Sequence, residues 1–166
     1  MIYYVTEDFL KNKTPITQNV SAKDLAPFIE MTVKTYVQPI LGYNFNRELL
    51  EKFNDETLSV IETELVEFIQ FVTGFYAVYD AIPSLTFRIS NKGIQSQFGD
   101  YQNSEGVATV TYLQNNMLKF AKVHESNLRA FLDLNRNAFP TYLAEINKDI
   151  EAPDQGTTRT DTTWLL

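Results

Sequence analysis

The sequence predicts a mainly α-helical protein: a small bundle of three long helices plus short helices, with one β-hairpin insertion and an extended C-terminal tail. Apolar residues recur three or four positions apart over long stretches, which is the period of a helix with one buried face. Between Leu85 and Phe98 the pattern changes to alternation, which is typical of paired strands. A chain of 166 residues with 44% hydrophobic content is expected to form one domain with a substantial core.

We divide the chain into an N-terminal arm at residues 1–20, a helical domain at residues 21–146 and an extended tail at residues 147–166. The arm begins with apolar residues, and it either covers its own core, the commoner outcome for a terminal segment, or reaches a neighbouring chain. The tail is polar but ends on Trp164, Leu165 and Leu166. These three residues either dock on another surface or form an unstructured end.

The first helical stretch is expected to run from Ser21 to Phe53 with a corner in its middle. Pro39 lacks a backbone donor and disfavours helical geometry in the residue before it, so the helix should end or kink at Val37–Gln38. Gly42 closes the corner, and Asn44 or Asn46 can cap the next helix. The apolar face consists of Leu25, Phe28, Ile29, Val33, Tyr36, Val37 and Ile40.

The second long helix is expected at residues 58–81, and it is apolar on nearly all sides between residues 65 and 79. Such a helix lies at the centre of a fold or of an assembly. Because a small domain seldom buries a helix on every side, the pattern favours an oligomer, with Phe71 and Phe75 as candidate interface residues. Gly74 indicates either a close helix crossing or no particular role.

Pro83 should end this helix, and a β-hairpin is expected at residues 85–98. A lone hairpin is marginally stable in water, so it should lie on the helices or pair with strands of another chain. Arg88 and Lys92 either meet an acidic partner or keep a strand edge soluble, and Ile94 and Phe98 are further candidate contacts.

The third long helix is expected at residues 105–137, followed by a short final helix at residues 141–146. Its apolar stripe includes Leu113, Phe120 and His124. His124 is the single histidine of the chain, and its neighbours do not supply a zinc site, a di-iron site or a catalytic triad. We therefore expect a core or interface role for this residue.

Composition narrows the possible functions. The absence of cysteine excludes disulfides, thiolate metal sites and cysteine nucleophiles, and neither a Walker loop nor a Rossmann fingerprint occurs. No N-terminal signal and no apolar run of the roughly 18 residues that a membrane helix needs is recognised. We expect a soluble protein that is not an enzyme and binds neither cofactor, metal nor membrane.

The net charge of −7 is unfavourable for tight binding of nucleic acid but suits a surface past which DNA slides. Acidic residues cluster between Glu48 and Glu67. A solvated face is the ordinary explanation for this cluster. The alternative is that Glu62, Glu64 and Glu67 face a channel and repel phosphates.

The early part of the sequence resembles a known family. The run Leu25-x-Pro27-Phe28-Ile29, then Tyr36-Val37-x-Pro39-Ile40-Leu41-Gly42 and Leu49-Leu50, is similar to the opening of the tailed-phage head–tail connector (adaptor) family. The version in phages of Bacteroidetes hosts, including the crAss-like group, fits best. Three later features agree with it: a hydrophobic second helix that ends near Pro83, the segment Lys92-Gly93-Ile94 and a long third helix. The resemblance therefore spans roughly Ser21 to Leu143, and it is a pattern of fold and packing without catalytic residues.

This resemblance implies a structural role in the virion. The family's subunits form a ring below the portal, with twelve copies by analogy, and continue the DNA channel to the tail. The partners would be further copies, the portal protein and other neck or tail proteins, with DNA only as passing cargo. Assembly would take place in the bacterial cytoplasm. The alternatives are a non-viral helical protein–protein binding module and, least favoured, an enzyme built on a helical bundle.

Overall fold

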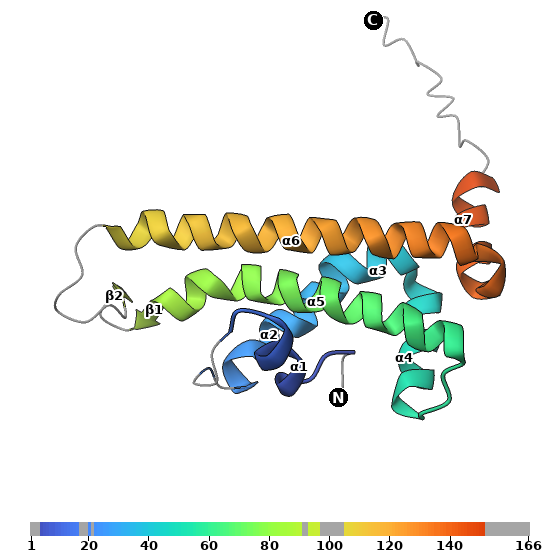
Figure 1. Cartoon of the computed structure of the whole chain (residues 1–166), viewed down its shortest axis with the longest axis horizontal. Helices are drawn as coiled ribbons and strands as arrows, with labels where there is room; N and C mark the ends of the chain where they lie inside the picture. Colours follow the sequence, from blue (N-terminus) through green and yellow to red (C-terminus); the bar gives the residue numbers. More distant parts are fainter. Residues whose placement is uncertain (1–3, 17–19, 21, 91–92, 97–104, 152–166) are drawn as a thin grey trace, which may run out of the picture.

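The computed structural model describes residues 4–16, 20, 22–90, 93–96 and 105–151, and it confirms a mainly helical fold. Two long antiparallel helices, α5 (Val60–Thr86) and α6 (Glu105–Asn135), lie side by side along the molecule (Figure 1). α1 (Glu7–Lys13) and α2 (Ala22–Thr32) pack on α5. α4 (Tyr43–Asn54) and α7 (Pro140–Glu151) meet at one end of the bundle.

The corner before α4 differs in form from the expected break. α2 continues through a π-helical turn, Val33–Val37, into α3 (Gln38–Leu41). The irregularity therefore lies where Pro39 predicts it, but the chain does not leave the helix there. Pro39 has no N–H to donate, and it stands at the second position of α3, directly after the π-helical turn. The predicted role of Gly42 is confirmed, since its φ of 80° turns the chain into α4.

α5 is the central helix, and the chain itself covers it. Every residue from Val72 to Val78 is buried. The cover comes from α1, α2, the π-helical turn and α6, so the burial of these residues does not require a second copy, whereas Phe68, Phe71 and Tyr79 are half-buried. By length and composition α5 could also cross a membrane, contrary to the expectation, but 56% of its apolar window is buried inside the fold. Burial in the bundle accounts for this composition.

α5 does not end at Pro83 as expected but continues to Thr86. A proline inside a helix frees the carbonyl four residues before it, here that of Tyr79. The Gln114 side chain of α6 donates a hydrogen bond to that carbonyl, with 3.4 Å between Nε2 and O. The neighbouring helix thus supplies a donor that Pro83 lacks.

The described part of the N-terminal arm covers its own core. The Tyr4 ring is buried, and its hydroxyl donates to the backbone oxygen and Oδ1 of Asn46 at 2.9 and 3.0 Å. α1 crosses α5 at Gly74, where a Cβ atom would lie 3.3 Å from Phe9 and 3.4 Å from Leu10. The close crossing that Gly74 indicated is therefore confirmed.

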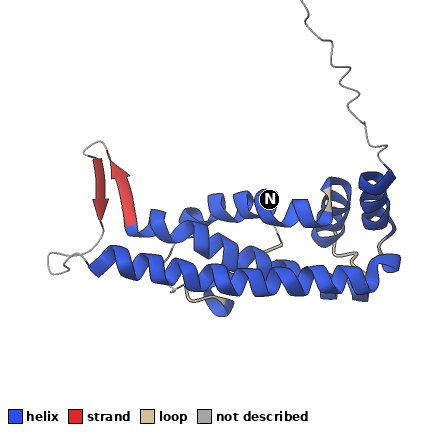
Figure 2. Ribbon diagram, turned by 90° about the horizontal axis from the view of Figure 1, so that it is seen from above, coloured by secondary structure: helices blue, strands red, loops and turns tan. Residues whose placement is uncertain are grey.

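Two short strands follow α5 at the other end of the bundle (Figure 2). β1 (Phe87–Ser90) and β2 (Gly93–Ser96) are antiparallel, with Phe87 opposite Ser96. Leu85, expected at the start of the hairpin, belongs to α5 instead. After α6, a 3-10 turn at Arg136–Ala138 leads to α7, which is longer than the final helix predicted.

Candidate interaction surface

Phe71 and Phe75, the candidate interface residues of α5, lie in the seam between α5 and α6. His124 stacks between them, with ring centroids 4.9 Å from Phe71 and 5.0 Å from Phe75. Phe9 of α1 and Phe120 of α6 extend this column at its two ends. Phe75 is only 9% exposed, so it offers little surface to another copy, whereas Phe71 is half-buried and its assignment to such an interface stays a prediction. Both rings join helices within one chain.

His124 is half-buried in this seam, and the sequence favoured a core or interface role for it. Burial lowers the pKa of its imidazole, so the neutral form is favoured between the two phenyl rings. Among the described residues, no group of three or more His, Asp and Glu side chains is arranged to hold a metal.

The remaining predicted contact residues are placed only in part. Arg88 and Ile94 lie within β1 and β2. The others fall outside the described residues: Lys92, Phe98, Trp164, Leu165 and Leu166.

Glu62 is a buried capping residue and is not part of an open acidic face. It is 8% exposed, and its Oε2 accepts hydrogen bonds from the backbone N–H and the hydroxyl of Ser59, at 2.8 and 2.7 Å. The Ser59 hydroxyl in turn accepts from the Glu62 N–H at 3.4 Å. This is a capping box at the start of α5, and the pattern Ser59-x-x-Glu62 could have revealed it in the sequence.

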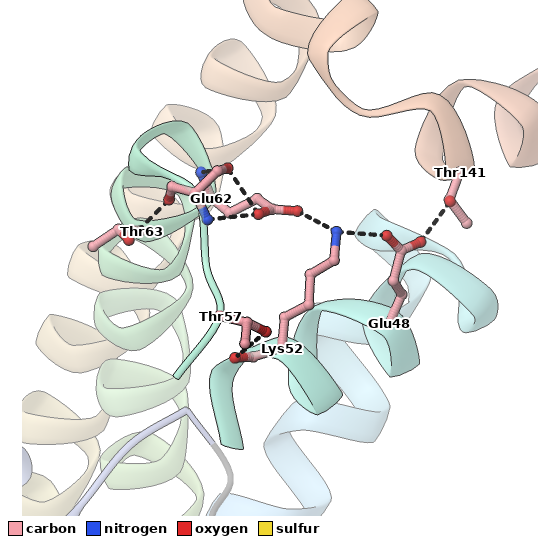
Figure 3. A network of polar contacts seen from close by, with 7 residues as sticks. Glu48, Lys52, Thr57, Glu62, Thr63 and Thr141 are labelled. Atoms are coloured by element: carbon pink, nitrogen blue, oxygen red, sulfur yellow. Dashed lines mark hydrogen bonds and ion pairs between the residues drawn. The ribbon is translucent and has the colours of Figure 1, made fainter. Parts of the chain in front are cut away.

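Lys52 connects this cap to α4 and α7 (Figure 3). Its ammonium lies 2.7 Å from Glu62 Oε1 and 2.8 Å from Glu48 Oε1. The other oxygen of Glu48 accepts a hydrogen bond from the Thr141 hydroxyl at 2.5 Å. Burial alone would raise the pKa of Glu62, but Lys52 and Ser59 together hold it below its ordinary value. Lys52 also lowers the pKa of Glu48. The network fastens three helices at one end of the bundle.

Glu64 and Glu67 are exposed on α5. Their exposure fits the solvated face that the sequence suggests as the ordinary explanation.

A second polar cluster joins the π-helical turn to the two long helices. Tyr36 and Tyr76 stack with their ring centroids 3.8 Å apart. The Tyr76 hydroxyl donates to Glu125 at 2.6 Å, and Glu125 pairs with Arg129 at 2.8 Å. Burial and the adjacent Glu125 raise the pKa of Tyr76, which keeps this hydroxyl protonated as a donor.

Among the residues that the structure describes, the large exposed apolar side chains gather mainly on one side of α6. The exposed fractions are 67% for Tyr112, 45% for Leu113, 48% for Phe120, 52% for Val123 and 85% for Leu134. The other large exposed apolar residues of the described chain lie singly on three further helices: Met31, Tyr43 and Val60. Single exposed apolar residues are normal, whereas a row of five on one helix side indicates an interaction surface.

We call this side the outer face of α6, and it contains no charged residue. Its members are Tyr112, Leu113, Asn116, Phe120, Val123, Asn127, Ala130 and Leu134. From Leu113 onward they are alternately three and four positions apart, the heptad spacing of a helix that pairs with another helix. Sequence reasoning missed the outer face because it assigned Leu113 and Phe120 to the buried stripe. Val123 and Leu134 are apolar residues outside that stripe, and they were the sequence signal for a second apolar side of the helix.

The fold and this surface define a class: a mainly helical protein with an exposed apolar face on one of its two long helices. The chain belongs to the family described as "Family of unknown function (DUF6712)", whose profile matches residues 37–151. The matched region begins within the π-helical turn and includes α4, α5, α6 and α7. Comparisons with curated proteins and with solved structures gave no match.

Proposed function

We propose that the protein is a head–tail connector (adaptor) subunit of a tailed-phage virion. In this role, twelve copies form a ring below the portal and continue the DNA channel to the tail. The residue pattern from Ser21 to Leu143 supports the proposal through its resemblance to that family. The structural observation that carries it is the outer face of α6, because a subunit of a ring needs an apolar surface that its own fold leaves uncovered.

The outer face extends along most of α6, from Tyr112 to Leu134, which corresponds to about 33 Å of helix at ~1.5 Å per residue. Copies arranged side by side would cover this face with a neighbouring subunit. The helices of each copy would then form part of the wall of a sleeve around the DNA.

Charge supports a sleeve through which DNA moves. The net charge of −7 opposes tight binding of phosphates. Glu64 and Glu67 are exposed and are the candidates for the channel side, whereas Glu62 is engaged in its cap. We include no catalytic step, cofactor or metal in the function.

Contacts with the portal and with other neck or tail proteins would use the expected hairpin and the C-terminal tail. The hairpin expected at residues 85–98 provides Arg88, Lys92, Ile94 and Phe98, and the tail provides Trp164, Leu165 and Leu166. The site of action would be the head–tail interface of the virion, after assembly in the host cytoplasm.

The test is to mix the full chain with the portal protein of the same phage and measure the mass of the complex. We expect a ring of connector subunits on the portal, visible by native mass spectrometry and electron microscopy. Val123→Lys should abolish the ring, and Lys122→Glu, an exposed neighbour outside the outer face, should leave it intact. A chain that never joins the portal would refute the proposed function.

A further inference from the structure

We propose that the free protein is a two-fold symmetric dimer, in which the outer faces of α6 from two copies pair in antiparallel orientation. This inference goes beyond the ring, since it concerns the protein before assembly. It rests on the outer face alone and does not require the proposed function.

The exposed area is sufficient for a dimer. The five large apolar residues of the outer face are 45% to 85% exposed. Since a large apolar side chain carries roughly 200 Å² of surface, they expose on the order of 600 Å² per copy. Pairing two copies would bury about 1,200 Å², which reaches the lower end of the range for specific protein interfaces. A second copy is thus large enough to be the occupant of this face.

The order of residues along the outer face matches itself when the direction of one helix is reversed. With the symmetry axis between residues 121 and 122, Asn116 lies opposite Asn127 and Phe120 lies opposite Val123. Leu113 then lies opposite Ala130. Each asparagine meets an amide that can donate and accept a hydrogen bond, and each of the four apolar residues in these pairs meets another apolar residue. Leu134 lies opposite Thr109 at the end of the pairing.

This match is specific to one register. Moving the axis by half a heptad in one direction places Asn116 opposite Leu134, and moving it in the other places Asn116 opposite Phe120. Either shift would bury an amide against an apolar side chain without a partner, which is unfavourable. The two asparagines therefore select the register, as single polar residues do in helix pairs.

Tyr112, at the edge of the outer face, and the residues beside this face also fit antiparallel pairing. In this orientation the same flank of both helices comes together, so Tyr112 approaches Asp133 and Lys119 approaches Ser126. No like charges meet, and the Tyr112 hydroxyl can donate to the Asp133 carboxylate. Parallel pairing would instead direct this flank toward the opposite flank of the partner, which contains the buried Met117. The polar groups would gain no partner there.

Engineered cysteines test the orientation directly, because the chain has none of its own. The variants are full-length Asn116→Cys and Asn127→Cys. After oxidation, a mixture of the two should give a disulfide-linked dimer, and each variant alone should not. Crosslinking of each variant with itself would indicate parallel pairing and overturn the proposal, as would the absence of crosslinking in the mixture.

The mass of the free wild-type chain is the second measurement. We expect a dimer, and Val123→Lys should raise its dissociation constant at least about 30-fold while circular dichroism stays unchanged. Lys122→Glu should leave the dimer intact. A monomeric wild-type chain would overturn the proposal, including the case in which residues 152–166 of the same chain cover the outer face. A ring on the portal from such a monomer would leave the proposed function in place.

Discussion

Removal of one carboxylate at the end of the bundle should destabilise a helix that begins about 100 positions earlier in the chain. α4 follows Gly42, which has no side chain to cap the free N–H groups of its first turn. Glu145 of α7 takes this role. Its Oε1 accepts from the backbone N–H and the side-chain amide of Asn44, both at 2.8 Å, and its Oε2 accepts from the Phe45 N–H at 3.4 Å.

The size of the effect follows from these contacts. Loss of a helix N-cap costs about 1 kcal/mol, and loss of a negative charge at a helix N-terminus costs roughly a further 0.3–1 kcal/mol. Glu145→Ala should therefore lower the free energy of unfolding by about 2 kcal/mol, or the melting temperature by roughly 4–8 °C for a chain of this size. Glu145→Gln keeps an acceptor oxygen but loses the charge, so its effect should be about half as large.

The assay is chemical unfolding followed by circular dichroism near neutral pH. Glu64→Ala is the matched control, since it removes an exposed glutamate from the surface of α5. If the free energies of unfolding of Glu145→Ala and Glu64→Ala differ by less than about 0.5 kcal/mol, capping of α4 from α7 is not a source of stability.

Three further predictions concern the interior of the bundle. The pKa values of Glu48 and Glu62 are lowered in the folded chain, so these two groups stabilise the fold at pH values above 4.5, and this stabilisation is lost as the pH falls through their folded pKa values. Lys52→Met removes a cause of both lowered pKa values, so in acid titrations followed by fluorescence the loss of stability should begin at a higher pH. Burial lowers the pKa of His124 below 6.5, so the unfolded chain binds this proton first and stability falls as the pH drops below 6.5. His124→Phe should reduce the stability difference between about pH 7.5 and about pH 5.5, and an unchanged difference would contradict the assignment. Gly74→Leu should displace α1, lower the free energy of unfolding by about 1–3 kcal/mol or more, and make amide exchange in α1 faster. Ser84→Leu, on the exposed side of α5, should have neither effect.

The course of the main helices could be predicted because it depends on local patterns. The apolar period places α5 and α6 within a few residues, and Gly42 and Gly74 have the roles that their chemistry suggested. α5 continues beyond Pro83, and the Tyr79 carbonyl, which has no proline N–H to accept from, accepts from Gln114, 35 positions away. A local pattern carries no information about such a donor.

The candidate site was harder to predict for the same reason. Periodicity shows that Phe71 and Phe75 lie on apolar sides of a helix, but it does not show whether α6 or another chain covers them. Glu62 was grouped with its acidic neighbours although Ser59 gave a local sign of a cap. Glu145 has no local sign at all, because its hydrogen-bond partner Asn44 is 101 positions away.

The capping of α4 by α7 also affects the order of folding during synthesis. α4 emerges from the ribosome well before residue 145 does. The N–H groups of its first turn are then open to solvent, because the Glu145 carboxylate that accepts from them has not yet emerged. Only when α7 emerges can the Glu145 carboxylate close this turn, and Thr141 then reaches Glu48 on the same helix. Folding of this end of the bundle is therefore completed by one of the last described segments to leave the ribosome.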